Sequence, residues 1–313
     1  MNTPPSSPVS VPVLALGIDT GGTQTRWALA NDAEEIIASG TAAGLSALQL
    51  SNHDGKQAFH QVLSCLADTA RSHGILQTVR AGITGLGDDI HSQQLHDMLA
   101  KTLGLPKSSI RLSNDIEIAY LDSFKAGAGY LIYAGTGSIA AFIDEAGEFH
   151  RAGGRGYLLD DGGSGFWIAR EAMRHIWRLE DEAPEQWRHS PLAQALFHLI
   201  GSSDWNASRD FIYHRGRGEI GTLALAVAAA AHTDPVALDI LQRAGVELAR
   251  LGMALCRRFG KRPMVLSGRV QELHPIIVES MRAHLADDIS LRQSICQAHF
   301  SAARLAAQHL KAL

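Results

Sequence analysis

The segment Leu16–Leu29 constrains the fold of this chain more than any other part of the sequence. An apolar run over Val13–Ile18 is typical of a buried strand, and apolar residues resume at Trp27. Between the two runs stand Asp19 and the four residues Gly21–Gln24, with the sequence Gly-Gly-Thr-Gln. A polar, glycine-containing break this short between two apolar runs predicts a β-hairpin with a very tight turn.

The composition of this turn predicts a phosphate site. Gly21 and Gly22 carry no Cβ, so their backbone N–H groups can approach an anion closely. Asp19 would repel a phosphate unless a divalent cation bridged them, and it therefore indicates Mg²⁺. The alternative is an ordinary Gly-Gly hairpin turn with an exposed Asp. Neither the helix-opening P-loop nor the dinucleotide fingerprint occurs in the chain, so the predicted nucleotide triphosphate site is built on a hairpin.

Bulk composition narrows the class of protein. With 313 residues the chain is long enough for two domains of ordinary size. The net charge of −4 provides no electrostatic case for nucleic acid or an anionic membrane as a partner. The three cysteines are far apart and form no Cys-x-x-Cys pair, as is typical of thiols in a reducing compartment. We expect a cytoplasmic protein whose residues 1–12 are a disordered leader and not a signal peptide.

The first 123 residues alternate between strand and helix patterns. Such alternation, after an initial three-stranded meander, predicts an α/β half with its loops gathered at one edge of a sheet. The expected strands lie in Val13–Ala42, Val79–Thr84 and Ile110–Ser113, and the expected helices at 54–73, 88–103 and Ile116–Ser123.

The same device begins again about 115 residues after the first one. Gly129–Tyr133 and Ile139–Ile143 predict two strands, and Ala134–Ser138 between them is a second glycine-rich turn. The rest of the chain predicts a helix at Phe166–Leu179, an irregular helical insert at Glu180–Arg217, helices at 221–232 and 235–259, a strand at Pro263–Leu266 and a final helix at 297–311.

Phosphoryl transfer to a hydroxyl needs a metal clamp, N–H donors around the phosphates and a base that orients the acceptor oxygen. Asp115 is the candidate base, because it follows the strand Ile110–Ser113 and open α/β sheets bind ligands at the carboxyl ends of their strands. Asp is also a good N-cap, so Asp115 can equally cap the helix that begins near Ile116. Its neighbour Asn114 is either a turn residue or a ligand contact.

Two further loops carry chemistry. Gly135, Thr136, Gly137 and Ser138 offer a second set of N–H groups and two hydroxyls, although an ordinary hairpin would show the same pattern. Asp161 stands in a loop where it can hold sugar hydroxyls, bind a metal indirectly or cap the following helix. Glycines crowd this loop, and such density usually means that a ligand or another backbone comes very close: Gly153, Gly154, Gly156, Gly162, Gly163 and Gly165.

Together these residues resemble the sugar-kinase, Hsp70 and actin superfamily, and within it the N-acetylglucosamine kinase and BadF-type ATPase branch. The resemblance runs from Val13 onward. Gly17-x-Asp19-x-Gly-Gly-Thr23-x-Thr25 resembles the first phosphate loop of the family, and Gly135–Ser138 resembles the second. Asn114-Asp115 stands where the family has its catalytic Asp, Asp161-x-Gly163-Ser164 resembles the core of a Gly-Asp-Glu-Gly-Ser motif, and Ser267-Gly268 resembles the adenosine-side turn.

The resemblance implies an α/β protein with two ribonuclease-H-like lobes and a nucleotide cleft between them. These lobes would comprise residues 13–123 and 124–296, with 297–313 as a helix that packs back on the N-terminal lobe. It implies Asp115 as the catalytic base and Asp19 as a Mg²⁺ contact through water. The implied ATP and phosphate contacts are Gly21, Gly22, Thr23, Gln24, Gly135, Thr136, Gly137, Ser138, Ser267 and Gly268, and the implied substrate contacts are Thr84, Gly85, Asn114, Asp115, Gly154 and Asp161.

The implied activity is an ATP-dependent kinase acting on an amino sugar, N-acetylglucosamine or glucosamine, at O6. A homodimer is expected, with the Trp-bearing insert 177–213 as a candidate surface. The alternative is a BadF-type ATPase that activates a partner protein. Such activators hold an iron–sulfur cluster through cysteines shared across a dimer, and Cys65, Cys256 and Cys296 form no evident cluster motif.

Three positions depart from the family pattern. Ala47 and Ile139 stand where the family kinases tend to have Asn, and Gly162 stands in place of the Glu of Gly-Asp-Glu-Gly-Ser. Polar contacts to sugar hydroxyls determine much of a kinase's choice of substrate. The ATP half of the resemblance is therefore stronger than the sugar half, and the identity of the sugar stays open.

Overall fold

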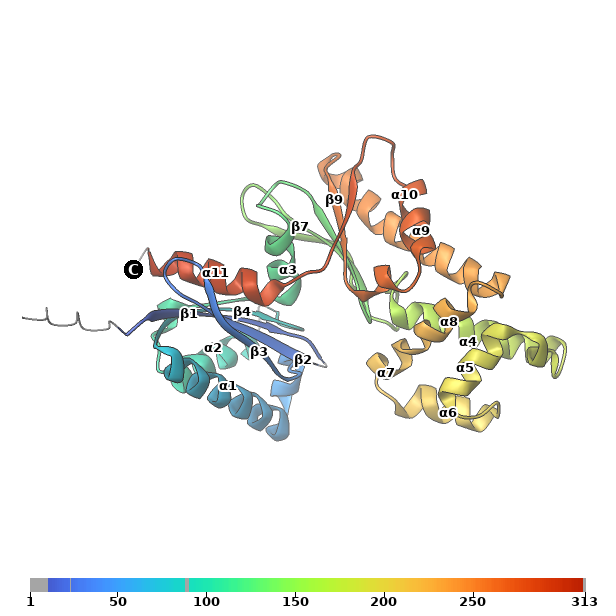
Figure 1. Ribbon diagram of the computed structural model, residues 1–313, viewed down its shortest axis with the longest axis horizontal. Helices are drawn as coiled ribbons and strands as arrows, with labels where there is room; N and C mark the ends of the chain where they lie inside the picture. Colours follow the sequence, from blue (N-terminus) through green and yellow to red (C-terminus); the bar gives the residue numbers. More distant parts are fainter. Residues whose placement is uncertain (1–10, 23, 88–89, 312–313) are drawn as a thin grey trace, which may run out of the picture. The chain divides into compact units, whose positions relative to one another are not determined.

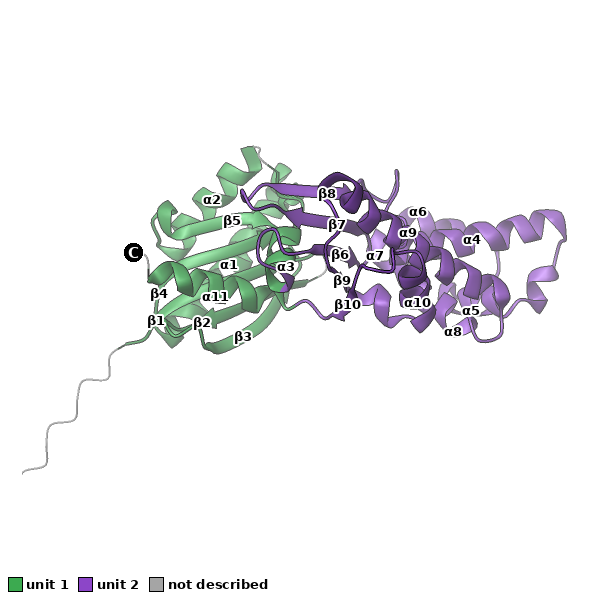
Figure 2. Ribbon diagram, turned by 90° about the horizontal axis from the view of Figure 1, so that it is seen from above, with its two compact units in different colours: residues 1–122, 297–313 green, residues 123–296 purple. Residues whose placement is uncertain are grey.

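The computed structural model describes residues 11–22, 24–87 and 90–311. Residues 1–10 of the expected leader and Thr23 of the first turn lie outside the described residues. The chain divides into two compact units, which Figure 2 colours green and purple. Unit 1 comprises Met1–Asp122 and Gln297–Leu313, and unit 2 comprises Ser123–Cys296.

Unit 1 contains a five-stranded sheet in the order β3-β2-β1-β4-β5. The first three strands form the expected antiparallel meander, and β4 and β5 run parallel to β1. The strands are β1 Val13–Thr20, β2 Gln24–Ala30, β3 Ile36–Ala43, β4 Ile75–Ile83 and β5 Ile110–Asn114.

The two faces of this sheet differ in side-chain size. Leu14, Leu16 and Ile18 lie in the core that α1 (His53–His73) and α2 (Ile90–Leu103) complete. On the opposite face Ala15, Ala28 and Ala30 pack against α11 (Ala298–Leu310), shown in red in Figure 1. A Cβ on Gly17 would lie 2.2 Å from the backbone nitrogen of Ala303, so glycine is required where α11 crosses β1.

Unit 2 contains a second five-stranded sheet, in the order β10-β9-β6-β7-β8. Here β6, β7 and β8 form the antiparallel meander, and β9 and β10 run parallel to β6, so strand order and directions repeat those of unit 1. The strands are β6 Tyr130–Ala134, β7 Ser138–Ile143, β8 Phe149–Gly153, β9 Met264–Ser267 and β10 Leu291–Ser294. The expected α/β class, with one sheet in each half of the chain, is confirmed.

The helices of unit 2 are more regular than expected. Within 180–217, Ser190 and Asp204 accept hydrogen bonds from the first turns of two helices, so this polar stretch divides into capped helices. Strands β8 and β10 and helix α10 were not expected at all. The helices of unit 2 are α4 Gly165–Glu182, α5 Pro191–Ile200, α6 Trp205–His214, α7 Arg217–Gly221, α8 Leu223–Ala230, α9 Pro235–Phe259 and α10 Pro275–Ala283. Helix α3, Asp115–Ser123, belongs to unit 1 except for its last residue.

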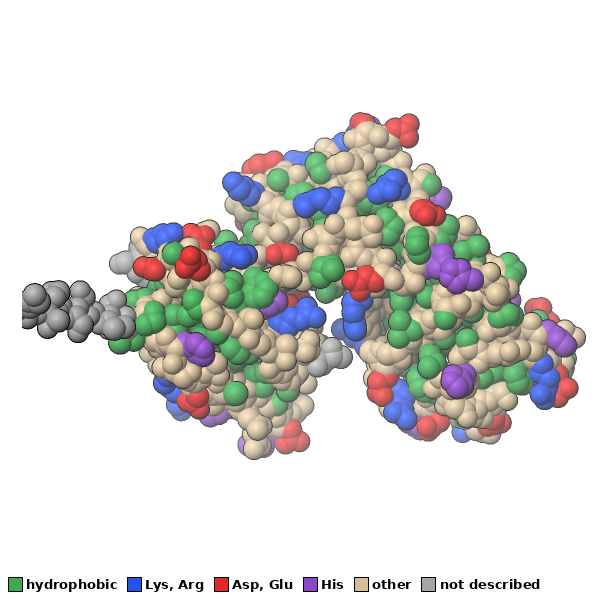
Figure 3. All heavy atoms as spheres, in the orientation of Figure 1, with side chains coloured by type: hydrophobic (Ala, Val, Ile, Leu, Met, Phe, Trp, Pro, Cys, Tyr) green, Lys and Arg blue, Asp and Glu red, His purple; other side chains and the backbone are tan. Residues whose placement is uncertain are grey.

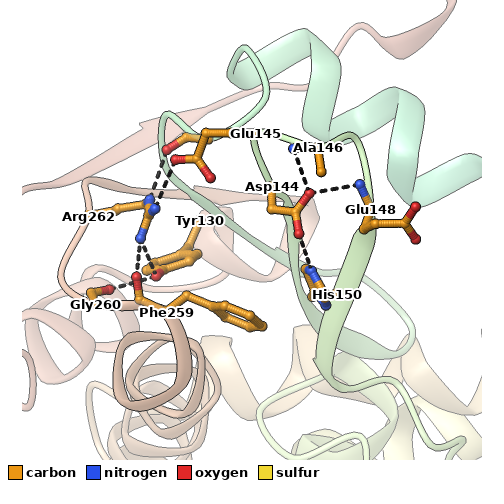
Figure 4. A network of polar contacts seen from close by, with 10 residues as sticks. Tyr130, Asp144, Glu145, Ala146, Glu148, His150, Phe259, Gly260 and Arg262 are labelled. Carbon is orange, nitrogen blue, oxygen red and sulfur yellow. Dashed lines mark hydrogen bonds and ion pairs between the residues drawn. The ribbon is translucent and has the colours of Figure 1, made fainter.

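A polar network stabilises the sheet of unit 2 at the end of β6 away from its turn (Figure 4). The guanidinium of Arg262 lies 4.8 Å from the ring centre of Phe142 and donates hydrogen bonds to the Gly127 carbonyl and to Glu145. The Tyr130 hydroxyl donates to the carbonyl of Gly260 at 2.6 Å. The network therefore joins the start of β6 to the end of α9.

No single helix among the described residues is long and apolar enough to cross a membrane; only Arg217–Ala230 and Pro235–Phe259 taken together, bent by 119°, have the length and composition. On the face drawn in Figure 3, acidic and basic side chains are interspersed in both units.

Candidate active site

In unit 1 the carboxyl ends of three parallel strands bring the candidate residues together. Asp19 of β1 is in register with Gly82 of β4, and Ile83 of β4 is in register with Asn114 of β5. A Cβ on Gly82 would lie 3.2 Å from the Cα of Asp115, so glycine here allows the start of α3 to approach β4. Residues 19, 84 and 115, distant in sequence, thus share one edge of the sheet.

Asp19 lies in an electrostatically unfavourable place for a carboxylate. Its pKa is raised to about 7, mainly by burial and secondly by the negative charge of Asp115. Arg26, its register partner on β2, acts in the opposite direction. A cation placed here would relieve the repulsion between the two carboxylates.

The residue before Asp115 takes part in capping α3. Asn114 Oδ1 accepts the N–H of Ile116 at 2.9 Å, and the Asn114 N–H is donated to Glu117 Oε1 at 3.2 Å. Asn114 therefore caps the helix through the N–H of its second residue, which it shares with Asp115 Oδ1 at 3.0 Å, and Glu117 accepts the N–H of Asn114. Asp115 therefore stands one residue inside the helix, and its Oδ2 accepts a hydrogen bond from the Thr84 hydroxyl at 2.6 Å. A role of Asn114 toward a substrate stays a prediction.

The β1–β2 turn closes through a hydrogen bond from the Gly21 N–H to the carbonyl of Gln24 at 2.9 Å. Neither Gly21 nor Gly22 has the positive φ that would demand glycine, and a Cβ on Gly22 would meet no described atom within 4 Å. The fold of the described residues therefore gives no steric reason for glycine at 22, which leaves room for a ligand. Thr23 lies outside the described residues.

Gly85 follows Thr84 and has φ +75, a conformation that favours glycine. The carbonyl of Thr84 accepts the N–H of Ala47 at 2.9 Å. Ala47 itself is buried in the core, so this departure from the family pattern presents no polar group.

In unit 2 the β6–β7 turn is held by the N-terminus of α4. The carbonyls of Gly135 and Thr136 accept the N–H groups of Gly165 and Phe166, at 2.9 and 3.3 Å. The buried Ser138 donates its hydroxyl to the carbonyl of Gly162 at 2.7 Å. This hydroxyl is thus used within the protein, in a contact that a phosphate does not need.

Asp161 lies against this turn. It is only 3% exposed, has the rare φ of +54, and its Oδ2 lies 2.8 Å from where a Cβ on Gly137 would stand. Burial raises the pKa of Asp161, and the N–H groups of Gly156 and Ser138 act against that rise. The structure therefore places Asp161 at the second glycine turn, and its role toward sugar hydroxyls stays a prediction.

The remaining predicted residues of unit 2 lie near the same strand ends. Gly154, with φ +61, donates its N–H to the Ser138 carbonyl at 3.0 Å. Gly268 has φ +94, and a Cβ there would lie 2.3 Å from the carbonyl oxygen of Ala134. Ser267 is fully buried, and its hydroxyl accepts a hydrogen bond from the N–H of Cys296. Its side chain therefore joins the end of β9 to the segment that follows β10.

Gly162, the third departure, has a carboxylate beside it. A Cβ on Gly162 would lie 2.8 Å from Oε2 of Glu247, a residue of α9. Glu247 accepts a hydrogen bond from Arg250 at 2.7 Å, and Arg250 also pairs with Asp160 at 3.2 Å. A helix distant in sequence therefore places a carboxylate beside the position where the family has its Glu.

A cavity of about 520 Å³ opens beside the β6–β7 turn. Gly135, Thr136 and Gly165 form one wall, and the other walls come from α7, α8 and the segment before α10. These other walls are not predicted from the sequence, although the small residues of 218–231 are a usable signal. The residues that line these other walls include Gly221, Thr222, Leu225, Ala228, His232, Arg269, Val270 and His274.

Mg²⁺ fits the carboxylate edge of unit 1 only as an ion with few protein ligands. No cluster of three or more His, Cys, Asp or Glu side chains among the described residues could hold a metal. Mg²⁺ usually keeps several waters and takes one or two carboxylates plus substrate phosphates. Asp19, whose repulsion with Asp115 a cation would relieve, is the residue here that suits such a site.

Known proteins resemble the chain in both sequence and fold. It is 24% identical over 237 residues to an N-acetylmuramic acid/N-acetylglucosamine kinase of Clostridium acetobutylicum, covering 74% of this chain and 76% of the other. It is 25% identical over 177 residues, 53% of its length, to the N-acetyl-D-glucosamine kinase of Dictyostelium discoideum, and spans only 55% of that protein. A structure assigned as an N-acetylglucosamine kinase from Chromobacterium violaceum superposes with a TM-score of 0.71 at 24% identity, over 94% of this chain and 99% of that one.

The family match extends over nearly the whole chain. Residues 16–295 match the model of the BadF/BadG/BcrA/BcrD ATPase family, a range that contains both glycine turns, both carboxylates of unit 1 and Asp161. The fold of the Chromobacterium violaceum protein agrees with the actin-like architecture that the motifs implied. The chain belongs to the BadF/BadG/BcrA/BcrD ATPase family.

Proposed function

We propose that this protein transfers the γ-phosphate of ATP to a hydroxyl of an amino sugar, with N-acetylglucosamine or glucosamine phosphorylated at O6. At the coarser level it is an ATP-dependent sugar kinase, since its curated relatives are sugar kinases and its family is one of ATPases. The observation that carries the proposal is the pair Asp19 and Asp115 beside the Gly21-Gly22 turn, at the carboxyl edge of the first sheet.

Asp115 is assigned as the general base. The sugar hydroxyl oxygen forms a bond to the γ-phosphorus, the bond from that phosphorus to the bridging oxygen of ADP breaks, and the hydroxyl proton passes to Asp115. Mg²⁺, when bound near Asp19, would neutralise charge on the phosphate oxygens. Gly22 in unit 1, and Thr136 and Gly137 in unit 2, are assigned as backbone donors to phosphate. The N–H groups of Gly21 and Gly135 close their own turns, onto the carbonyls of Gln24 and Gly137.

The nucleoside is assigned to the cavity of unit 2. Its walls are mainly apolar or small, with Leu225, Ala228 and Val270 among them, and Gly135 and Thr136 adjoin it. An apolar hollow next to a glycine turn suits a base whose phosphates extend along that turn. Asp161 and Gly154 are assigned to the sugar side, along with Gly85.

Mg²⁺ as the metal, a homodimer and a cytoplasmic location complete the proposal. The Mg²⁺ assignment follows from the carboxylate edge, and the location from the use of ATP together with three free cysteines, Cys65, Cys256 and Cys296. The dimer is proposed through the aromatic insert, where Trp205 and Tyr213 are half or more exposed.

The testing experiment measures ADP release from Mg-ATP with a panel of sugars: N-acetylglucosamine, glucosamine, N-acetylmannosamine, N-acetylmuramic acid and glucose, and a control without sugar. We expect strong stimulation by one amino sugar and a phosphorylated product whose position NMR identifies. Slow hydrolysis that no sugar stimulates would contradict the proposal and favour the second candidate, an ATPase that drives a partner protein. The family match favours that candidate, and an iron and sulfide assay on protein purified without oxygen would test it.

A further inference from the structure

Thr84 occupies a distinctive position between the ends of two parallel strands. It follows β4 directly, and its hydroxyl oxygen lies 2.6 Å from Asp115 Oδ2 and 2.5 Å from the carbonyl oxygen of Thr20. Its backbone N–H is donated to the Thr20 hydroxyl at 3.1 Å. Thr84 is thus fixed to the end of β1 on one side and contacts the candidate base on the other.

Hydrogen-bond chemistry determines what this hydroxyl does. A threonine hydroxyl has one proton, and both of its close neighbours here are acceptors. An ionised carboxylate is the stronger acceptor, so the proton points to Asp115 whenever Asp115 is charged. The other carboxylate oxygen, Oδ1, accepts the N–H of Ile116 at 3.0 Å. This N–H is shared with Asn114 Oδ1 at 2.9 Å, so the Thr84 hydroxyl is the stronger of these two contacts that limit rotation of the carboxylate.

We propose that Thr84 is a positioning residue that orients the Asp115 carboxylate toward the acceptor hydroxyl, and that it does not itself bind the sugar. This inference rests on the proposed function, in which Asp115 is the base. A carboxylate oxygen has two lone pairs, so the hydrogen bond from Thr84 does not by itself prevent Oδ2 from accepting the substrate proton. Loss of the hydroxyl removes one of the contacts that orient the Asp115 carboxylate and leaves the residue in place, which affects turnover more than binding.

The test compares Thr84→Val, which keeps the shape and removes the hydroxyl, with Thr84→Ser, which keeps the hydroxyl. We expect Thr84→Val to lower kcat by about 10- to 100-fold, while KM for sugar and ATP changes less than about threefold. Thr84→Ser should stay within about threefold of the wild-type kcat. A rise in KM for sugar at unchanged kcat would overturn the proposal, because it would show that Thr84 contacts the substrate.

Thr78 provides a matched control on the same strand. Its buried hydroxyl donates a hydrogen bond to the carbonyl of Ala306 in α11 at 2.9 Å. Thr78 lies near the start of β4, whereas Thr84 follows the end of that strand, next to Asp115. Thr78→Val should lower the melting temperature and leave kcat unchanged. A loss of kcat in Thr78→Val as large as in Thr84→Val would show a general packing effect and overturn the proposal.

A double-mutant cycle with Asp115→Asn gives a second readout. If Thr84 acts through Asp115, adding Thr84→Val to Asp115→Asn lowers the residual single-turnover rate no further; a multiplicative loss overturns the proposal. If Thr84→Val does not fold, Thr84→Ala and Thr84→Ser replace it in the same comparison. Wild-type protein that no sugar stimulates refutes the proposed function and this inference with it, whereas active wild type with an unchanged Thr84→Val variant refutes this inference alone.

Discussion

The two sheets share one strand order but present different chemistry at the same edge. In unit 1 the strand before the glycine turn ends in Asp19-Thr20, whereas in unit 2 the equivalent strand ends in Tyr133-Ala134. The next parallel strand leads to Thr84 in unit 1, which contacts Asp115, and to Gly268 in unit 2, which packs on the Ala134 backbone. The strand ends of the first edge carry a carboxylate, Asp19, and lead to a second, Asp115, whereas those of the second edge carry none.

This difference shows that topology and chemistry are specified separately. A meander followed by parallel strands places several strand ends at one edge in both units. The residues at those ends then decide what the edge can do. Carboxylates suit a metal and proton transfer, whereas small residues beside a cavity suit the close approach of a nucleotide backbone and base.

The largest expected effect is a loss of kcat on removing the carboxylate charge of Asp115 in unit 1, compared with the same change at Asp161 in unit 2. Asp115→Asn should lower kcat by about 10²- to 10⁴-fold, because it removes the base, and should leave the Kd for ATP within about twofold. Asp161→Asn should affect KM for sugar and stability more than kcat. Steady-state kinetics and calorimetric ATP titration provide the measurements. Equal losses of kcat in both variants would break the comparison.

A second prediction concerns stability and pH at Asp19. Its folded pKa of about 7 exceeds the unfolded value of 3.8, so the folded state binds more protons and loses stability as pH rises from about 4 to 7. Without Mg²⁺, Asp19→Asn should raise the free energy of unfolding at pH 8 by on the order of 2 kcal/mol, and by little at pH 4. Urea melts at both pH values measure this.

Asp68, an exposed carboxylate of α1, is the matched control for Asp19. Asp68→Asn should show no comparable dependence on pH. A pH-independent effect of Asp19→Asn on stability would mean that burial and Asp115 do not raise the pKa of Asp19. The difference in charge between the sheet edges of the two units would then be smaller than described.

A third prediction compares the two glycine turns directly. Gly22→Ala meets no described atom and should leave the melting temperature unchanged, while weakening Mg-ATP binding by about tenfold if phosphate approaches this backbone. Gly137→Ala brings a Cβ to 2.8 Å from Asp161 Oδ2 and should lower both stability and binding. Normal ATP affinity in a folded Gly22→Ala variant would argue against a phosphate at the first turn.

The smallest expected effect lies at the other end of β6. Arg262→Ala removes contacts with Phe142, Glu145 and Gly127, and should cost unit 2 about 1 kcal/mol of stability without changing kcat. Lys261→Ala, which removes an exposed pair with Asp288, should change stability by less than about 0.5 kcal/mol. A fall in kcat for Arg262→Ala would show that the end of β6 away from the turn also contributes to catalysis.

Local patterns predicted much of the fold. The hairpin at Gly21-Gly22, the helix at 54–73 and the helix at 235–259 are all observed, because each has a periodicity or turn that its own residues specify. Strands β8 and β10 were missed, since Phe149–Gly153 and Leu291–Ser294 are short, polar in part, and form strands only through their neighbours.

The candidate site was predicted as a set of residue types and not as an arrangement. Asp115 could be a base or a cap, and Asn114 a turn residue or a ligand contact; only the structure shows that Asn114 caps α3 and that Asp115 contacts Thr84. Likewise Gly162 indicated a missing carboxylate, and the structure places Glu247 of α9 beside it. No local pattern links residues 85 positions apart.

The sequence by itself determined the class of this protein: two glycine turns between apolar strands, a carboxylate before the first, and a strand–helix alternation that belongs to one ATPase family. These are local properties, set by backbone freedom at glycine and by the burial of apolar runs. Only the tertiary structure decided that Thr84 contacts Asp115, that Asp161 lies against Gly137, and that a cavity opens beside Gly135. Those relations depend on sheet register and helix packing, which sum weak contacts over many distant residues.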